Sequence, residues 1–144
     1  MIRAATLALA VALSPPVQAQ NLDFCAALAQ LSHAATQPDG PAPVISFPGG
    51  QGREVPCTSA LELGGVRSLS CRWAHPYRSE GAAQAFAQLL TEITACVGPA
   101  IGGDTPVNHP DSYDLRRFPD GISAALKDKA ALRESIVILR VQGQ

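Results

Sequence analysis

The feature that most restricts the fold of this chain is an apolar run near its C-terminus, at residues 135–141. The run, SIVILRV, carries apolar residues at both odd and even positions, whereas a strand with one face in water alternates between apolar and polar residues. A strand that is apolar on both faces belongs in the interior of a sheet, with helix covering at least one side. We therefore expect a central β-strand here.

A helix suited to cover that sheet is predicted at 80–97. Apolar residues recur there at the period of one helix face; they are Phe86, Leu89, Leu90, Ile93 and Val97. Ser79 offers an N-terminal cap, and Gly98-Pro99 ends the pattern, because glycine favours the position after a helix and proline cannot continue it. The spacing of apolar residues predicts a second amphipathic helix over 22–35.

The first predicted hairpin lies between the two helices. Residues 57–63 and 69–73 alternate between the two faces of a strand, and Gly64-Gly65 between them is a turn signal. Cys71 and Trp73 share the inward face of the second strand, while Arg72 points outward. We expect Trp73 in the core.

A second hairpin is predicted at 113–118 and 122–127. The sequence Phe118-Pro119-Asp120-Gly121-Ile122 contains the Pro-Asp-Gly signal of a tight turn. Helix-forming residues dominate from Ala124 to Glu134, so strand plus turn and helix are alternatives for 122–134. We take the turn signal as the stronger one, with a turn or helical loop at 127–132.

These elements predict an α+β fold in the order α-β-β-α-β-β-β. Its antiparallel sheet has about five strands, with the long helix packed on one face and an additional N-terminal helix. Residues 37–56 hold five prolines and four glycines, which predicts a long surface loop with a short extended piece at 44–47.

The N-terminus resembles a secretory signal peptide in its layout. One Arg precedes an apolar run at 4–13, and Val17-Gln18-Ala19 places small or slender residues before a cleavage site. We predict a signal peptide at 1–19 and a single disulfide-bonded domain at 20–144. The chain is thus expected to be exported, to the bacterial periplasm or beyond it, with no integral membrane segment in the mature part.

Four cysteines predict two disulfides in an exported chain: Cys25, Cys57, Cys71 and Cys96. The sequence contains no Cys-x-x-Cys spacing, the pattern that would indicate a zinc site. We favour Cys71–Cys96, which would join a strand to the helix packed on it, with Cys25–Cys57 as the second bond. The alternative begins with Cys57–Cys71, since both lie on one face of the first hairpin.

The charge pattern gives candidate binding residues. The chain has 11 Lys and Arg against 12 Asp and Glu, so no basic surplus draws it to nucleic acid. A basic strip is nevertheless expected on the open face of the sheet, from Arg72, Arg78, Arg116, Arg117, Lys127 and Lys129. Such a strip would recognise an anionic or acidic partner; otherwise it is a solvated face.

Two histidines supply the only candidate constellation for catalysis. His75 and His109 each precede a proline, and Asp104, Asp111 and Asp114 are near in sequence. Such a set could form an acid–base pair or a metal site. No nucleophile elbow or phosphate-binding loop is present in the sequence, and neither a cofactor nor a metal site is predicted.

The favoured interpretation is an exported, non-enzymatic domain that binds a protein or a cell-envelope component. The Pro/Gly-rich loop and the outward face of the sheet are the candidate contact surfaces. The alternative is a small hydrolase or metal-dependent enzyme that uses His75 and His109 with a nearby aspartate. A purely structural envelope protein is a third hypothesis.

Overall fold

The computed structural model of the chain describes residues 17–37, 39–41, 43–46 and 54–144. Most of the predicted signal peptide, and the middle of the predicted loop at 47–53, lie outside the described residues. The helices are α1 (Val17–Ala35) and α2 (Glu80–Val97), with short 3₁₀ turns η1 (Pro119–Gly121) and η2 (Ala130–Leu132). The strands are β1 (Val44–Ser46), β2 (Glu54–Pro56), β3 (Thr58–Leu61), β4 (Arg67–Pro76), β5 (Gly102–Asp104), β6 (Tyr113–Arg117), β7 (Ile122–Lys129) and β8 (Glu134–Gln142).

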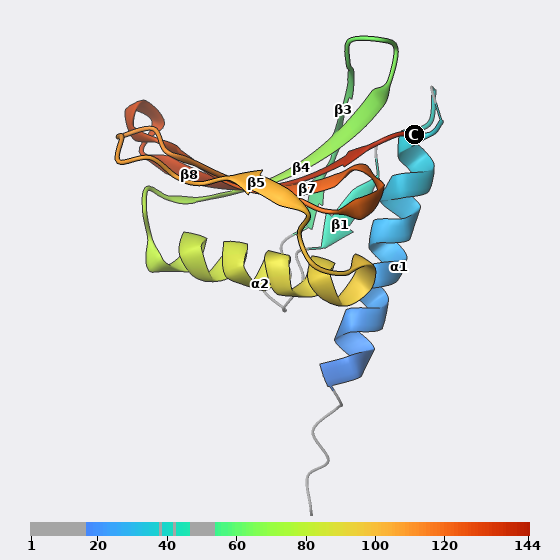
Figure 1. Ribbon diagram of the computed structural model, residues 1–144, viewed down its shortest axis with the longest axis horizontal. Helices are drawn as coiled ribbons and strands as arrows, with labels where there is room; N and C mark the ends of the chain where they lie inside the picture. Colours follow the sequence, from blue (N-terminus) through green and yellow to red (C-terminus); the bar gives the residue numbers. More distant parts are fainter. Residues whose placement is uncertain (1–16, 38, 42, 47–53) are drawn as a thin grey trace, which may run out of the picture.

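The predicted α+β class is confirmed. Six strands form one antiparallel sheet in the order β3-β4-β8-β7-β6-β5, and β1 and β2 form a separate antiparallel pair. The apolar strand β8 is central, between β4 and β7, as its two-sided apolar pattern requires. α2 packs along one face of the sheet, which we call the covered face, and α1 stands beside the end of the sheet near the C-terminus (Figure 1).

The core lies between the covered face and the helices. Trp73, Val137 and Leu139 line the middle strands with 1% or less of their surface exposed, and Leu89 and Ile93 of α2 pack there with none exposed. The predicted helix at 80–97 is confirmed residue for residue. Ser79 Oγ accepts a hydrogen bond of 3.2 Å from the Ala82 N–H, as an N-cap does.

Both predicted hairpins are present. Gly64 and Gly65 have φ of 89° and 82°, values that favour glycine, and they join β3 to β4. In the second hairpin β7 runs to Lys129, so residues 122–129 are strand despite their helix-forming composition. Pairing with β6 on one side and β8 on the other outweighs that composition.

Sequence reasoning missed β5, β2 and the pairing of β1 with β2. β5 consists of Gly102, Gly103 and Asp104, residues depleted in strands, so no sequence signal marks it. Its place depends on close backbone approach: a Cβ on Gly103 would lie 2.2 Å from the Leu115 carbonyl oxygen. The extended piece foreseen at 44–47 is β1.

The favoured disulfide pairing is wrong. The structure joins Cys57 to Cys71 and Cys25 to Cys96, with Cα–Cα distances of 4.2 and 5.3 Å. Cys57 lies one step beyond the Thr58–Ser70 pair of the β3–β4 hairpin, directly opposite Cys71, as in the alternative. Cys25 instead meets Cys96 where α1 packs against the C-terminal end of α2. Two disulfides are compatible with an exported protein.

Candidate functional site

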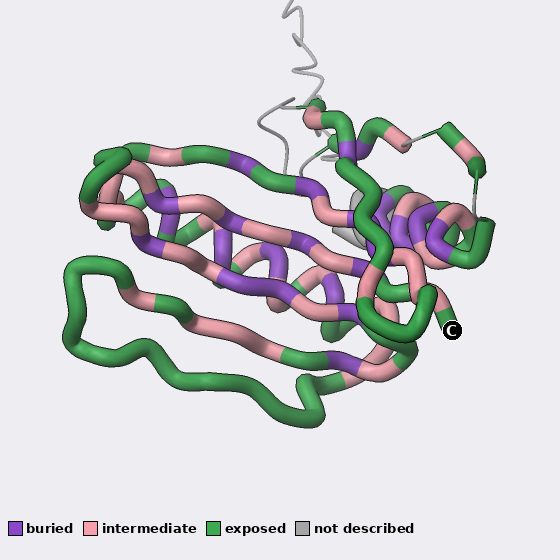
Figure 2. Tube along the Cα trace, turned by 90° about the horizontal axis from the view of Figure 1, so that it is seen from above, coloured by how far each residue is buried: buried purple, intermediate pink, exposed green. Residues whose placement is uncertain are grey.

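The face of the sheet opposite the helices, which we call the open face, has no described helix over it. Figure 2 looks onto this face, and no described segment crosses the middle of the strands. The face is concave along the strands, because the β3–β4 hairpin rises at one end and the connections of β6, β7 and β8 rise at the other (Figure 1). A concave surface without a cover is a candidate binding site.

Apolar side chains form the centre of the open face. In the strand register, Ile138 of β8 lies opposite Ala125 of β7, and Ala125 lies opposite Leu115 of β6. Ile136 and Tyr113 flank Lys127 in the neighbouring row. Tyr113 is 41% exposed and, among the described strands, has a neighbour only on the β7 side, because β5 pairs only with residues 115–117. This row structure gives the face a hydrophobic middle.

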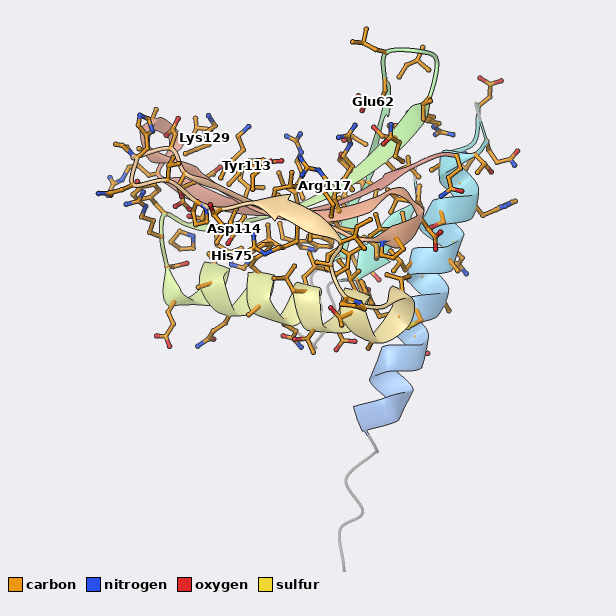
Figure 3. The ribbon with its side chains drawn as sticks, in the orientation of Figure 1. Glu62, His75, Tyr113, Asp114, Arg117 and Lys129 are labelled. Carbon is orange, nitrogen blue, oxygen red and sulfur yellow. A yellow bond between two sulfur atoms is a disulfide. The ribbon has the colours of Figure 1, made fainter. Side chains whose placement is uncertain are left out.

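Cations lie around that centre, and Lys127 lies within it. Alternation along the strands brings five of them to the open face: Arg72, Arg117, Lys127, Lys129 and Arg140. Three carboxylates share the face: Glu62, Asp104 and Glu134. Figure 3 shows Glu62, Tyr113, Arg117 and Lys129 on this side of the sheet. Asp111 of the adjoining loop pairs with Lys129, so four carboxylates accompany the five cations.

Two of the five cations have no carboxylate partner. Arg140 pairs with Glu62, and Arg117 Nη2 lies 3.1 Å from Asp104 Oδ2, but Arg72 and Lys127 take part in no ion pair among the described residues. Hydrogen bonds from Ser68 and Arg140 lower the pKa of Glu62, so the Arg140 pair is fully charged at neutral pH. Exposed pairs of this kind contribute little to stability and exchange readily with other charges.

A shallow groove of about 430 Å³ lies at the β6 side of the open face. Its apolar lining includes Ile101, Leu115, Ala125 and Ile138, and the charged residues that line it are Arg117, Arg140 and Asp120. Ile101 is 72% exposed, so the groove ends in an apolar surface open to solvent. The groove is a place for an apolar side chain of a partner, with cations beside it.

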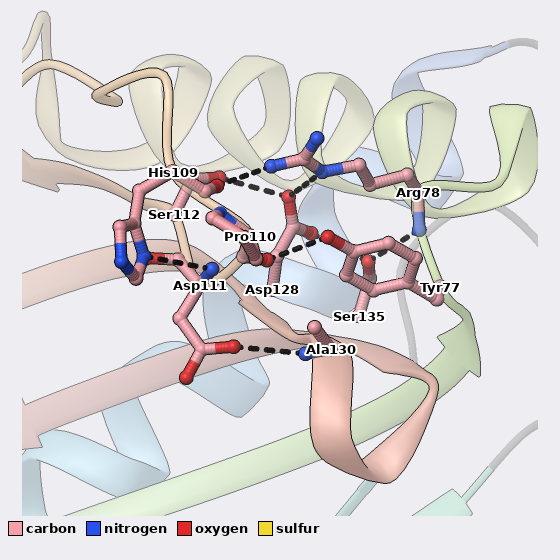
Figure 4. Close-up of polar contacts among 9 residues, drawn as sticks. All are labelled: Tyr77, Arg78, His109, Pro110, Asp111, Ser112, Asp128, Ala130 and Ser135. Atoms are coloured by element: carbon pink, nitrogen blue, oxygen red, sulfur yellow. Dashed lines mark hydrogen bonds and ion pairs between the residues drawn. The ribbon is translucent and has the colours of Figure 1, made fainter.

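Of the predicted binding residues, Arg72 lies on the open face and Arg78 does not. Arg78 follows β4, and its Nε donates a hydrogen bond of 3.1 Å to the buried Asp128 carboxylate (Figure 4). Asp128 also accepts hydrogen bonds from Ser135 and Ser112, and the Tyr77 hydroxyl donates to the Pro110 carbonyl oxygen. Arg78 also donates a hydrogen bond to the His109 carbonyl oxygen, and these contacts together hold the loop before β6 against the sheet.

The prediction that Arg116 lies on the open face is wrong. Arg116 lies opposite Ala124, which lies opposite Leu139 on the covered face. The reason is the buried Phe118 two residues later, because residues two apart in an extended chain share a face. Arg116 is half-buried and pairs with Asp114. Its neighbour Arg117 takes the open-face position.

His75 and His109 lie in different surroundings. His75 lies opposite Ser135 on the covered face, where Figure 3 shows it on the side of α2. His109 lies in an exposed loop, where its Nδ1 accepts a hydrogen bond of 3.0 Å from the Asp111 N–H. The Asp111 carboxylate is engaged by the Ala130 N–H and by Lys129. The described residues contain no group of three or more His, Cys, Asp or Glu side chains arranged for a metal ion.

Sequence reasoning missed Arg140 and Glu62 as open-face residues. Arg140 stands within the apolar run that predicted β8, two residues after Ile138 and therefore on the same face. The sequence shows that the even-numbered residues of β8 share one face of the strand. Only the register of β8 against β4 and β7 shows that this face is the open one.

Neither described helix is long and apolar enough to cross a membrane. Comparisons of this chain with models of protein families, with curated protein sequences and with solved structures found no match.

Proposed function

We propose that this chain is an exported, non-enzymatic domain that binds a protein partner through the open face of its sheet. The observation that carries the proposal is the group of apolar side chains on that face with cations among and around them. The cores of protein–protein interfaces are apolar, and the residues that contribute most to binding are often Tyr and Arg. Tyr113 and Arg72 supply both residue types on the open face.

The size of the open face bears on the same proposal. Its six strands, about 4.8 Å apart, span about 24 Å across the sheet. Because β5, β3 and β6 have only three to five residues each, the flat area lies below the roughly 800 Å² that a standard interface buries on each partner. A specific partner would therefore also contact the rising ends of the sheet.

The partner is expected to present carboxylates. Arg72 and Lys127 are cations without a counter-charge beside apolar side chains, so a partner with Asp or Glu around an apolar patch would satisfy both features. The compartment belongs to the proposal as well: the signal-like N-terminus and the two disulfides favour an oxidising compartment, the bacterial periplasm.

Site-specific photo-crosslinking in the source organism tests the proposal. A benzophenone amino acid replaces Tyr113 on the open face in one variant and Thr91, on the exposed surface of α2, in the control. We expect one crosslinked protein from the Tyr113 position and none from Thr91. Adding Arg72→Gln and Lys127→Gln to the Tyr113 variant should reduce the crosslinked product at least about fivefold.

A charge-matched control separates a local effect from one of net charge. Ala83→Glu with Thr91→Glu lowers the net charge by the same two units on the exposed surface of α2. This pair should leave crosslinking from Tyr113 unchanged. Equal crosslinking from both positions, or no product from Tyr113, would contradict the proposed binding face.

A further inference from the structure

The two edge strands of the sheet differ in how they are protected against pairing with another chain. β5 carries a charge at Asp104, which pairs with Arg117. β3 (Figure 1) reads Thr-Ser-Ala-Leu, without charge or proline, and all of its residues are exposed. Leu61 at its end is 78% exposed, and Leu63 in the following turn is fully exposed. Charges, prolines and bulges commonly protect sheet edges, so the edge of β3 is a candidate for strand pairing.

The backbone groups of β3 alternate between β4 and the free edge. In antiparallel ladders the Cα atoms of non-hydrogen-bonded pairs lie about 4.5 Å apart, and those of hydrogen-bonded pairs about 5.5 Å. Cys57 and Cys71 lie opposite each other with their Cα atoms 4.2 Å apart, so theirs is a non-hydrogen-bonded pair. At the other end of β3, the Glu62 N–H donates to the Val66 carbonyl oxygen over 2.7 Å. Counting inward from either end, even-numbered residues bond to β4 and odd-numbered ones do not.

Ser59 and Leu61 therefore direct their N–H and C=O groups away from β4. The preceding odd-numbered residue shows where such groups point, because the Cys57 N–H donates to the Pro43 carbonyl oxygen over 2.9 Å. Ser59 and Leu61 have no such backbone partner among the described residues. Two donors and two acceptors are thus exposed along the edge, at the spacing of a strand.

A groove of about 620 Å³ lies beside this edge. Its lining includes Ser59 and Leu61 of β3, together with Ala35 and Asp39 at and after the end of α1. Arg67 also lines the groove, but its guanidinium already donates to backbone carbonyl oxygens at and after the end of α1. Asp39 is exposed and takes part in no ion pair among the described residues. The groove therefore offers apolar side chains and one unpaired carboxylate next to the free backbone groups.

The neighbours of β3 favour a segment of another protein over a second copy of this chain. Antiparallel pairing through Ser59 and Leu61 of both copies would place Leu63 of each copy opposite Cys57 of the other. The Cys57 N–H is already bonded to Pro43, which occupies that place. A separate extended segment can lie between Pro43 and the turn at Leu63, a length of about five residues or 16 Å.

We propose that the edge of β3 is a second binding site, which takes an extended segment of a partner protein as an added strand. The N–H and C=O groups of the segment bond to those of Ser59 and Leu61. Its alternate side chains enter the groove, where an apolar residue packs on Leu61 and a Lys or Arg lies near Asp39. This site uses the backbone at the edge of the sheet and is independent of the open face.

Peptide display supplies the probe. A random library of peptides of about nine residues is selected on the purified protein and depleted on Ser59→Pro. Because the Ser59 N–H points away from β4, proline there removes an edge donor and keeps the β3–β4 hydrogen bonds. Ser59→Pro should therefore unfold within about 3 °C of the wild type, whereas Ala60→Pro, which removes a β3–β4 bond, should lose more than about 5 °C.

Backbone methylation of the selected peptides tests strand addition on the unmodified protein. An N-methyl group removes one donor, and only alternate residues of an added strand donate to β3. Fluorescence anisotropy should show binding at least about fivefold weaker after methylation at one alternate set of positions, and less than about twofold weaker at the set between.

Charge variants of the protein test the role of the groove. Asp39→Asn should weaken peptide binding about threefold, because a basic residue of the peptide loses its counter-charge. Asp23→Asn removes the same charge from an exposed position of α1 and should leave binding unchanged. Arg72→Gln with Lys127→Gln alters only the open face and should also leave it unchanged.

Four results would overturn the inference. They are a display selection from which Ser59→Pro removes no peptide, methylation effects without a period of two, and a Ser59→Pro variant as unstable as Ala60→Pro. The fourth is sedimentation of the wild type as a dimer that Ser59→Pro makes monomeric, because a second copy would then occupy the edge. Crosslinking from Tyr113 tests the open face separately, and its outcome leaves this inference unaffected.

Discussion

Asp128 and Ser135 lie opposite each other on β7 and β8, and Ser135 Oγ donates a hydrogen bond of 2.5 Å to Asp128 Oδ1. Asp128 as a residue is 6% exposed, and its carboxylate also accepts hydrogen bonds from Ser112 and Arg78. Burial raises the pKa of Asp128, but the hydrogen bonds from Ser135, Ser112 and Arg78 outweigh it, so the pKa is lowered overall. The folded state thus favours the ionised carboxylate.

Stability should therefore fall on acidification through Asp128. Because its folded pKa lies below the unfolded value of 3.8, the stabilisation is fully present above pH 3.8 and is lost as the pH falls through the folded pKa. Asp128→Asn should cost about 1–3 kcal/mol near neutral pH and give a shallower loss of stability below pH 3.8. Chemical denaturation across this pH range measures both effects.

Asp39→Asn is the control for Asp128, because it removes a carboxylate from an exposed position. It should change the unfolding free energy by less than about 0.5 kcal/mol at neutral pH. An Asp128→Asn variant with wild-type stability and an unchanged acid profile would show that the cluster around Asp128 does not stabilise the fold.

The two disulfides should differ in their rate of reduction. Cys57 and Cys71 are buried, with 1% and 0% of their surface exposed, whereas Cys25 and Cys96 are half-buried at the surface of the two helices. A thiolate must reach a sulfur to reduce the bond, so a mild reductant should open Cys25–Cys96 first. Timed alkylation with peptide mass spectrometry measures the order; simultaneous loss of both bonds would contradict it.

Alanine substitutions at two glycines should change stability in opposite directions. Gly121 has φ of 72°, and a Cβ there would lie 2.8 Å from the Gln142 carbonyl oxygen, so Gly121→Ala should cost about 1–3 kcal/mol. Gly81 lies in the first turn of α2 with no atom nearer than 3.9 Å, so Gly81→Ala should add up to about 1 kcal/mol. Thermal unfolding compares the two; losses of equal size would be inconsistent with these backbone positions.

Neighbouring residues of β8 should respond unequally to truncation. Leu139 faces the core with no exposed surface, and Ile138 beside it is half-buried on the open face. Leu139→Ala should cost about 2–5 kcal/mol, whereas Ile138→Ala should cost about 1 kcal/mol. Denaturant midpoints report the difference, and a larger cost at Ile138 would mean that the two faces of β8 are assigned the wrong way round.

Local patterns predicted the elements well where one pattern dominates. The stripe from Phe86 to Val97 gave the bounds of α2, and the two-sided apolar run gave β8 and its central place. The glycine-rich β5 could not be found, because its strand character comes from the approach of Gly103 to Leu115 and not from side chains.

The kind of site, a basic sheet face, was predictable from the sequence, but the residues that form it were not. An outward basic face was expected, and Arg72 belongs to it, but Arg116 does not and Arg140 does. In a strand, odd- and even-numbered residues lie on opposite faces. If one residue is assigned to the wrong face, every other residue of that strand is therefore assigned to the wrong face as well. The disulfide pairing failed for a related reason, because the crossing of α1 and α2 is set by tertiary packing and leaves no mark in the spacing of Cys25 and Cys96.

The central position of β8 determines when the sheet can form during synthesis. β8 follows all the other strands in the sequence, yet β4 and β7 both need it as their neighbour. While residues 134–142 are still inside a ribosome, the emerged segments can form only separate hairpins with unpaired strand edges. The six-stranded sheet can therefore be completed only after every other strand has been synthesised.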